Sequence, residues 1–229
     1  MATEDIKRNI DSLPRYIVVE GPIGVGKTTL VTRLGAQLNA RTILEIFEEN
    51  PFLPDFYRER DRYAFQTEMF FLLSRFRQQE TFAQEELFAR FTISDYLFFK
   101  CRLFAGMTLS EHERVLFDRV YDIIARSVPV PDLVIYLRAP TATLMERIAR
   151  RGRDYEQQMD EQYIRQLLQV YDNFFKDYKE APLLTVDTTH LDFHSDEALQ
   201  LLLETMISTS LRGGRYHLSG DGPVQGTLS

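Results

Sequence analysis

Two residue types are almost missing from this chain of 229 residues, which has one cysteine, Cys101, and no tryptophan. A single cysteine excludes an internal disulfide framework and a zinc site built on cysteines, and it is typical of a reducing compartment. The sequence has no run of about 18 apolar residues, and its first fifteen residues contain no apolar stretch. We therefore expect a cytoplasmic protein with no secretory signal and no membrane partner.

Positive charge is also scarce, because 27 Lys and Arg stand against 34 Asp and Glu, for a net charge of −7. Binding to duplex nucleic acid through its phosphates would need a long basic patch, and the sequence has none. Nucleic acid is therefore not an expected partner. Five arginines nevertheless fall between Arg138 and Arg153. Arginine binds phosphate and carboxylate in a bidentate manner, so this cluster is either part of a phosphate site or a solvated helix face.

Short apolar segments alternate with longer helical patterns along the chain. Strands are expected at residues 16–19, 42–44, 91–93, 132–137 and 183–186, and helices between them include 27–38 and 62–86. Parallel strands need such long crossovers, so the pattern predicts an α/β fold with a five-stranded parallel sheet covered by helices on both faces. Residues 1–15 are expected to form a polar leader, residues 16–211 one domain, and the glycine-rich residues 212–229 a flexible tail.

The most specific motif is GPIGVGKT, which begins at Gly21 and fits the pattern G-x-x-x-x-G-K-[ST] of a phosphate-binding loop. It follows an expected strand and opens an expected helix. In such a loop the backbone N–H groups wrap a phosphate, Lys27 reaches the β- and γ-phosphate oxygens, and the Thr28 hydroxyl ligates Mg²⁺. A nucleoside triphosphate and Mg²⁺ are therefore the expected ligands of the loop. The residues expected to hold the nucleotide here are Gly21, Pro22, Ile23, Gly24, Val25, Gly26, Lys27, Thr28 and Thr29.

A kinase with this loop also needs a base for the acceptor hydroxyl, a second magnesium ligand and cations over the transferred group. No N-K-x-D motif is present, which argues against a GTPase switch. Glu45 and Asp95 each follow an expected strand, at the carboxyl edge where open α/β sheets bind their ligands. Position alone also allows both to be solvated loop acids. The arginines from Arg147 to Arg153 follow another expected strand, where a lid could close over phosphates.

Five segments together resemble the deoxynucleoside kinases, and within them the bacterial deoxyguanosine and deoxyadenosine kinase branch. They are GPIGVGKTTL (21–30), EIFEENPFLPDFY (45–57), RYAFQTEMFFLLSRFRQ (62–78), SDY (94–96) and RIARRGRDYE (147–156). The resemblance covers residues 16–211. It implies a P-loop kinase fold with an arginine-rich lid, usually dimeric, that transfers the γ-phosphoryl group of ATP to the 5′-hydroxyl of a deoxyribonucleoside.

The resemblance also implies roles for single residues. Glu45 matches the catalytic base, and Lys27 and Arg153 the cations that act on the transferred group. The remaining matches are Arg151 in the lid, Tyr57 and Glu156 at the 3′-hydroxyl, and Asp192 and Phe193 along the adenine of ATP. Many members carry an acid-Arg-Ser triplet after the third strand. This chain has Ser94-Asp95-Tyr96, which keeps Asp95 as a magnesium ligand and lacks the arginine.

Pairing residues 62–78 with the family pattern puts Glu68 where many members read the base with Gln, and Arg75 where some keep an Arg. A carboxylate only accepts hydrogen bonds, and guanine offers N1–H and N2–H₂ side by side, with O6 and N7 as acceptors for Arg75. Lys100 lies near a position where relatives have a carboxylate, and it would suit O6. Deoxyguanosine is therefore the expected substrate, with deoxyadenosine or a broad range of deoxynucleosides as the alternative.

Two other functions stay open at this point. The missing arginine would suit a nucleotide-binding regulatory subunit of a mixed kinase dimer. A nucleotide kinase of the thymidylate kinase type is disfavoured, because Glu45 would repel a monophosphate acceptor. The expected assembly is a homodimer or, alternatively, a heterodimer with a related kinase.

Overall fold

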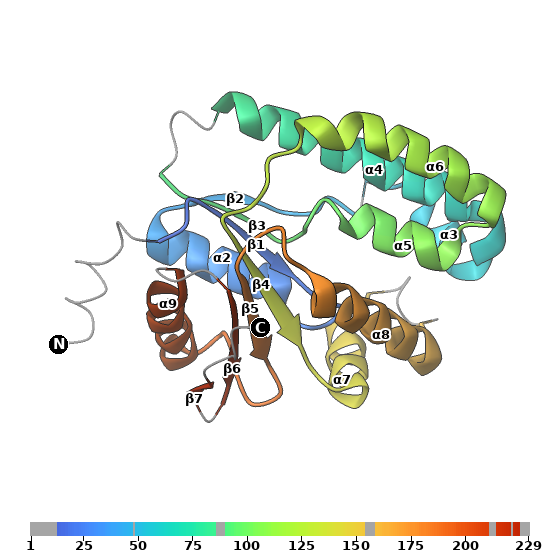
Figure 1. Ribbon diagram of the computed structural model, residues 1–229. Helices are drawn as coiled ribbons and strands as arrows, with labels where there is room; N and C mark the ends of the chain where they lie inside the picture. The colour runs from blue at the N-terminus through green and yellow to red at the C-terminus, as the bar shows by residue number, and fades with distance from the viewer. Residues whose placement is uncertain are drawn as a thin grey trace.

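The computed structural model describes residues 13–47, 49–85, 90–153, 159–210, 214–220 and 222–224, without the side chains of 81–85, 208–210 and 222–224. Within these residues the chain forms a seven-stranded sheet of order β2-β3-β1-β4-β5-β6-β7 (Figure 1). Strands β1 to β6 are parallel, and β7 is antiparallel to β6. The strands are β1 Tyr16–Glu20, β2 Arg41–Ile43, β3 Thr92–Ser94, β4 Leu133–Arg138, β5 Leu183–Asp187, β6 Arg215–Ser219 and β7 Gly222–Val224.

Helices fill the crossovers between the parallel strands. They are α2 Lys27–Leu38, α3 Leu53–Arg58, α4 Arg60–Glu85, α5 Lys100–Thr108, α6 Glu111–Ile124, α7 Thr141–Arg151, α8 Glu161–Asp177 and α9 Asp196–Ser210, with a short 3₁₀ turn at Ala125–Ser127. Local chemistry sets several of their ends. Ser110 and Glu113 form a capping box at the start of α6, and Asp160 accepts a hydrogen bond from the Tyr163 N–H at the start of α8. Gly152 ends α7 in the left-handed region, with φ +67°.

The predicted α/β fold with a parallel sheet is confirmed, but the predicted number of five strands is wrong. The additional strands β6 and β7 come from the segment that the composition predicted to be a tail. In β6, Leu218 is buried and Tyr216 packs against the core. Two alternating apolar residues are enough for a short strand near the edge of a sheet. Surrounded by glycines and polar residues, they give too weak a periodic pattern to predict that strand from the sequence. Residues 1–12 and 225–229 lie outside the described residues.

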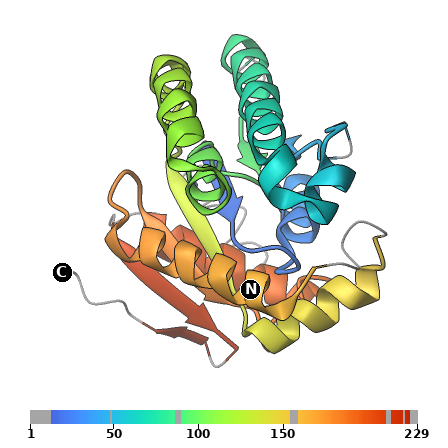
Figure 2. The same ribbon diagram turned by 90° about the vertical axis from the view of Figure 1, so that its right-hand side faces the viewer.

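Both faces of the sheet are covered, because successive side chains of a strand point to opposite faces. Ile17 and Val19 of β1 belong to the core that includes α2, α7 and α9. Val18 belongs to the core on the other face, where Tyr171 and Phe175 of α8 pack. Figure 2 shows α8 lying across that face, with α4 and α6 rising from the sheet as a separate helical layer.

The strand order places a ligand crevice at the carboxyl end of β1. This strand lies between β3 and β4, so the crossovers on its two sides run in opposite directions. Open α/β sheets bind their ligands at such a switch point. The loop that follows β1 and the start of α2 occupy this place.

Candidate active site

Residues 21–26 connect β1 to α2, and their glycines allow a tight backbone path. Gly24 and Gly26 have φ values of +82° and +102°, which residues with a side chain rarely adopt. A Cβ atom on Gly24 would lie 2.8 Å from Cγ1 of Ile148 and 3.0 Å from the carbonyl oxygen of Leu144, so only glycine lets the loop pack this closely on α7. Gly26 is the N-cap of α2, whose first N–H groups give the loop positive potential.

Lys27, the first residue of α2, folds back over this loop. Its Nζ donates hydrogen bonds to the carbonyl oxygens of Gly21 at 2.6 Å and Pro22 at 3.0 Å. Burial and the nearby Lys100 cation lower the pKa of Lys27 to about 8, although neighbouring acids oppose the shift. The ammonium is thus held at the loop by backbone acceptors, and phosphate oxygens are acceptors of the same kind.

Thr28 and Asp95 form a pair between α2 and the end of β3. The Thr28 hydroxyl donates to Oδ2 of Asp95 at 2.8 Å, and the Glu45 backbone N–H donates to Oδ1 at 2.7 Å. Burial and the charge of Glu45 raise the pKa of Asp95. Mg²⁺ prefers oxygen ligands such as these and takes others from water and phosphate. No group of three or more His, Cys, Asp or Glu in the described ranges is arranged to hold a metal.

Glu45 lies just after β2, with a buried cation at each of its carboxylate oxygens. Arg75 of α4 contacts Oε1 through Nε at 3.0 Å and also through Nη2, and Nζ of Lys100 of α5 donates to Oε2 at 2.6 Å. Burial alone would raise the pKa of Glu45, but the two cations outweigh it and hold the pKa well below its usual range. Glu45 is therefore ionised and fixed in orientation.

Glu68 is the second carboxyl group on this side, and its surroundings are different. It is 2% exposed, and Oε1 accepts a hydrogen bond from the Thr108 hydroxyl at 3.1 Å. Burial raises the pKa of Glu68 to about 7, and the more distant charges of Arg75 and Lys100 only partly offset this. Unlike Glu45, it makes no ion pair with a described residue.

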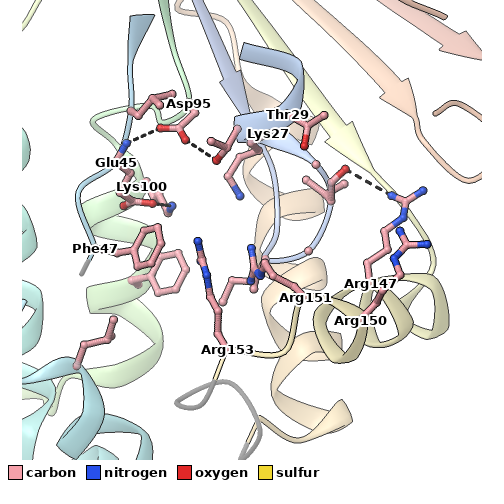
Figure 3. A pocket seen from close by; sticks show the side chains of 18 of the residues that line it. Lys27, Thr29, Glu45, Phe47, Asp95, Lys100, Arg147, Arg150, Arg151 and Arg153 are labelled. Atoms are coloured by element: carbon pink, nitrogen blue, oxygen red, sulfur yellow. Dashed lines mark hydrogen bonds and ion pairs between the residues drawn. The ribbon is translucent and has the colours of Figure 1, made fainter. Parts of the chain in front are cut away.

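These groups line one cavity of about 1040 Å³ at the carboxyl edge of the sheet (Figure 3). Gly21 and Pro22 accept the hydrogen bonds of Lys27 and are not in the lining, whereas Ile23 to Thr29 are. Glu156 lies outside the described residues. The other residues predicted for the site are brought together in the lining, namely Lys27, Thr28, Thr29, Glu45, Tyr57, Glu68, Arg75, Asp95, Lys100, Arg151, Arg153, Asp192 and Phe193.

The arginines of the predicted lid line this cavity from α7 and from Arg153, two residues beyond the end of the helix. Arg147 bonds Thr188 through Nη1 to Oγ1 at 2.9 Å and through Nη2 to the carbonyl oxygen at 2.7 Å. Arg153 follows the helix-ending Gly152, and its guanidinium lies 4.0 Å from the centre of the Phe47 ring. Figure 3 shows Arg153 and Lys27 pointing into the same space from opposite sides. The arrangement puts cations around one space next to a fixed carboxylate.

Several lining residues were not predicted from the sequence, and Thr67 is one of them; Glu20, which was also not predicted, lies just behind the lining. Thr67 of α4 is 1% exposed and lines the cavity. Glu20, the last residue of β1, is fully buried and accepts hydrogen bonds from the N–H groups of Gly21 and Leu97 and from the Tyr171 hydroxyl. It ties the start of the phosphate loop to the segment after Asp95 and to α8. The available signal was an acid at the end of the apolar run YIVVE.

Comparisons with known proteins agree with this geometry. Residues 17–209 match the family model described as deoxynucleoside kinase. The chain is 38% identical to a deoxyguanosine kinase of Bacillus subtilis over 183 residues, which cover 78% of this chain and 88% of the relative. It is 32% identical to a deoxyadenosine kinase of Dictyostelium discoideum over 167 residues, covering 71% and 67%.

A solved structure of a deoxyadenosine kinase from M. mycoides with bound dATP shares the fold, with a TM-score of 0.72 at 24% identity over 83% of this chain and 98% of that one. In the parts of the chain that the structure describes, every helix is too short or too polar to cross a membrane. The phosphate loop, the parallel sheet and the family match together show that the chain belongs to the deoxynucleoside kinases, which are ATP-dependent phosphotransferases.

Proposed function

We propose that this deoxynucleoside kinase acts on purine deoxynucleosides, with deoxyguanosine as the preferred substrate and magnesium-bound ATP as the phosphoryl donor. The observation that carries the proposal is Glu68, a buried carboxyl group in the cavity that makes no ion pair with a described residue. When ionised it is a pure acceptor, which matches the N1–H and N2–H₂ edge of guanine. The 38% identity to a deoxyguanosine kinase supports the same choice.

Glu45 is the proposed general base. Its two cations keep it ionised and oriented, so it is ready to accept the proton of the 5′-hydroxyl. A low pKa does not prevent this, because a loose transition state has little bonding to the attacking oxygen, so the hydroxyl need not be deprotonated in advance and loses its proton late, as the bond to phosphorus is completed. Arg75 uses Nε, Nη1 and Nη2 toward Glu45 and Cys101. Each Nη carries two hydrogens, so one on each is left for the proposed contact with O6 and N7.

Lys27 and Arg153 are the proposed catalytic cations, because both point into the space beside Glu45 (Figure 3). Bound Mg²⁺ would neutralise charge on the phosphates, and Thr28 and Asp95 are its proposed protein ligands, a role that their mutual hydrogen bond supports. Arg151 is proposed to contact the phosphates, and Asp192 and Phe193 to lie along adenine. The Phe193 side chain is also part of the hydrophobic core.

Tyr57 reaches the cavity from α3, where we propose that it contacts the 3′-hydroxyl together with Glu156. Lys100 was expected at O6. Its bond to Glu45 supports a position nearer the 5′-oxygen, as the alternative to a contact with O6.

We also propose a homodimer, or a heterodimer with a related kinase. Exposed apolar side chains on the outer helical layer support a dimer, because Leu73 of α4 is 49% exposed and Ile123 of α6 is 72% exposed. Figure 1 shows these two helices side by side at one end of the molecule. A cytoplasmic location is proposed from the single cysteine.

The test is a panel of deoxyguanosine, deoxyadenosine, deoxyinosine and deoxycytidine with ATP and Mg²⁺, assayed for the 5′-monophosphates. At about pH 8, where Glu68 is ionised, we expect kcat/KM for deoxyguanosine to exceed that for deoxyadenosine by at least about tenfold, because the carboxylate then has no hydrogen to donate to N1 of adenine. A preference for deoxyadenosine would refute the substrate assignment. Nucleotide binding without turnover of any nucleoside would instead support the regulatory-subunit alternative.

A further inference from the structure

Thr67 has a buried polar atom that makes no hydrogen bond to a described residue. Its Oγ1 atom has no partner, although the residue is 1% exposed. A threonine in a helix can usually donate to the carbonyl group four residues earlier, but this one does not. Leaving such a group unpaired costs about 1–3 kcal/mol, so a buried orphan hydroxyl needs an explanation. Because Thr67 lines the active-site cavity, the missing partner can be part of a ligand.

Helix geometry shows where the hydroxyl lies relative to Glu68. Consecutive residues of a helix are about 100° apart, so Thr67 and Glu68 belong to neighbouring stripes of α4. The stripe of Thr67 includes Ala64 and Phe71, which pack with α3. Asn50, just before α3, also donates through Nδ2 to the Thr67 carbonyl oxygen at 3.2 Å.

The stripe of Glu68 faces α5 instead. Thr108 of α5 donates to Glu68, and Arg75, two turns further along this stripe, contacts Cys101 of α5. If Glu68 binds one edge of a ligand base, the part of that edge nearer α3 therefore lies next to Thr67. That is also the side from which Tyr57 enters the cavity, so it is the sugar side of a bound nucleoside under the proposed function.

Guanine has a hydrogen that matches this position. A carboxylate can accept N1–H and one hydrogen of the N2 amine, and the second N2 hydrogen then points away along the sugar edge of the base. We propose that Thr67 is a specificity-determining residue whose hydroxyl oxygen accepts this second N2 hydrogen. The proposal rests on the proposed function, because it places guanine against Glu68. It adds a reader for the amine that distinguishes guanine from hypoxanthine.

The test compares Thr67→Val, which keeps the shape and removes the hydroxyl, with Thr67→Ser, which keeps the hydroxyl. Deoxyinosine has N1–H and O6 but lacks the amine. For Thr67→Val we expect kcat/KM to fall about tenfold on deoxyguanosine, the worth of one neutral hydrogen bond, and less than about twofold on deoxyinosine. Thr67→Ser should keep the wild-type ratio of the two substrates.

Thermal stability provides a second readout that separates a lost contact from a damaged fold. Thr67→Val should melt at the wild-type temperature or above it, since it removes an unpaired buried hydroxyl. Thr205→Val is the matched control. Its hydroxyl is also buried but donates to Leu201 at 2.8 Å in α9, so this variant should lose stability and keep the substrate ratio.

If the ratio of kcat/KM for deoxyguanosine to that for deoxyinosine is unchanged in Thr67→Val, the proposal is overturned. An equal loss on both substrates is one such result, and it would mean that Thr67 only shapes the pocket. The proposed function fails separately, if wild-type enzyme prefers deoxyadenosine or if Glu68→Gln leaves the ratio of deoxyguanosine to deoxyadenosine unchanged.

Discussion

Replacing Glu68 by Gln removes a carboxyl group whose burial raises its pKa to about 7, compared with an ordinary value of 4.5. The local hydrogen bonds are consistent with this. The Thr108 hydroxyl has one hydrogen and two acceptors in reach, Oε1 of Glu68 at 3.1 Å and the Phe104 carbonyl oxygen at 2.9 Å. When the Thr108 hydroxyl donates its hydrogen to the Phe104 carbonyl oxygen, its own oxygen can accept the proton of a protonated Glu68 carboxyl group. The charged groups around Glu68 are Arg75, Lys100 and Glu45, and their signs partly cancel.

The raised pKa predicts how stability depends on pH. Folded protein keeps the Glu68 proton to higher pH than unfolded protein does, so this contribution is complete below about pH 4.5 and is lost as pH rises through about 7. Between about pH 5 and pH 8 the unfolding free energy of the wild type should fall by about 2.5 kcal/mol relative to that of Glu68→Gln. A proton bound by the folded protein but not by the unfolded protein changes the unfolding free energy by about 1.4 kcal/mol per pH unit. Urea denaturation of both proteins at several pH values measures this difference. A difference that stays constant with pH would show that Glu68 titrates normally.

The same proton links pH to substrate choice. Guanine presents two donors and needs the ionised carboxylate, so deoxyguanosine binding at about pH 6 should release close to one proton and should tighten about tenfold per pH unit up to about 7. Adenine can pair N1 and N6–H₂ with the protonated acid, so deoxyadenosine should release none. Calorimetry in two buffers of different ionisation enthalpy counts these protons. If deoxyguanosine binding releases no proton and its affinity is flat with pH, Glu68 does not contact the base.

Two further predictions concern the transfer step. Glu45→Gln should lower kcat by about 10² to 10⁴ with deoxyguanosine affinity retained, because it removes the base and keeps the shape. The exposed neighbour Glu49→Gln is its control, and an equal loss there would move the base along the loop. Arg153→Ala should lower kcat by about 10³, the scale of an arginine at a transferred phosphoryl group. Arg165→Ala, an exposed arginine of α8 paired with Glu161, should have no effect, and a loss of less than tenfold for Arg153→Ala would contradict the assignment.

Local chemistry explains which parts of the fold could be predicted. The strand, loop and helix around Gly24 and Lys27 follow from adjacent residues, and the observed helix begins at Lys27 as expected. Glu45 and Asp95 were both expected at the carboxyl edge because each follows a strand. The structure places them in contact, through the Glu45 N–H and the Asp95 carboxylate.

Contacts between distant segments could not be predicted in the same way. The pairing of Glu45 with Arg75 and Lys100 joins a loop to two helices, over 30 and 55 residues of sequence. No periodicity predicts such an interaction, and Arg75 and Lys100 were assigned to the base from their match to the family pattern. Thr67 was missed for a related reason. A threonine beside an apolar stripe gives no signal until its hydroxyl is found buried without a partner.

The charges in the cavity indicate why the lid has so many arginines. Six charged side chains that line the cavity largely neutralise one another. They are the acids Glu45, Glu68 and Asp95 and the cations Lys27, Arg75 and Lys100, so together they provide little net positive charge for a triphosphate. The compensating charge would then come from the α7 arginines, from Arg153 and, under the proposed function, from bound Mg²⁺.

The α7 arginines are crowded in the structure. Burial and the charge of Arg150 lower the pKa of Arg147, and an anion placed among these residues relieves that repulsion. Arg153 lies beyond the end of α7 and points into the same space as Lys27 (Figure 3), so its removal should affect transfer of the phosphoryl group far more than nucleoside binding. Its effect on kcat and that of Thr67→Val on the ratio of deoxyguanosine to deoxyinosine should then be independent, and the double variant should show both losses in full.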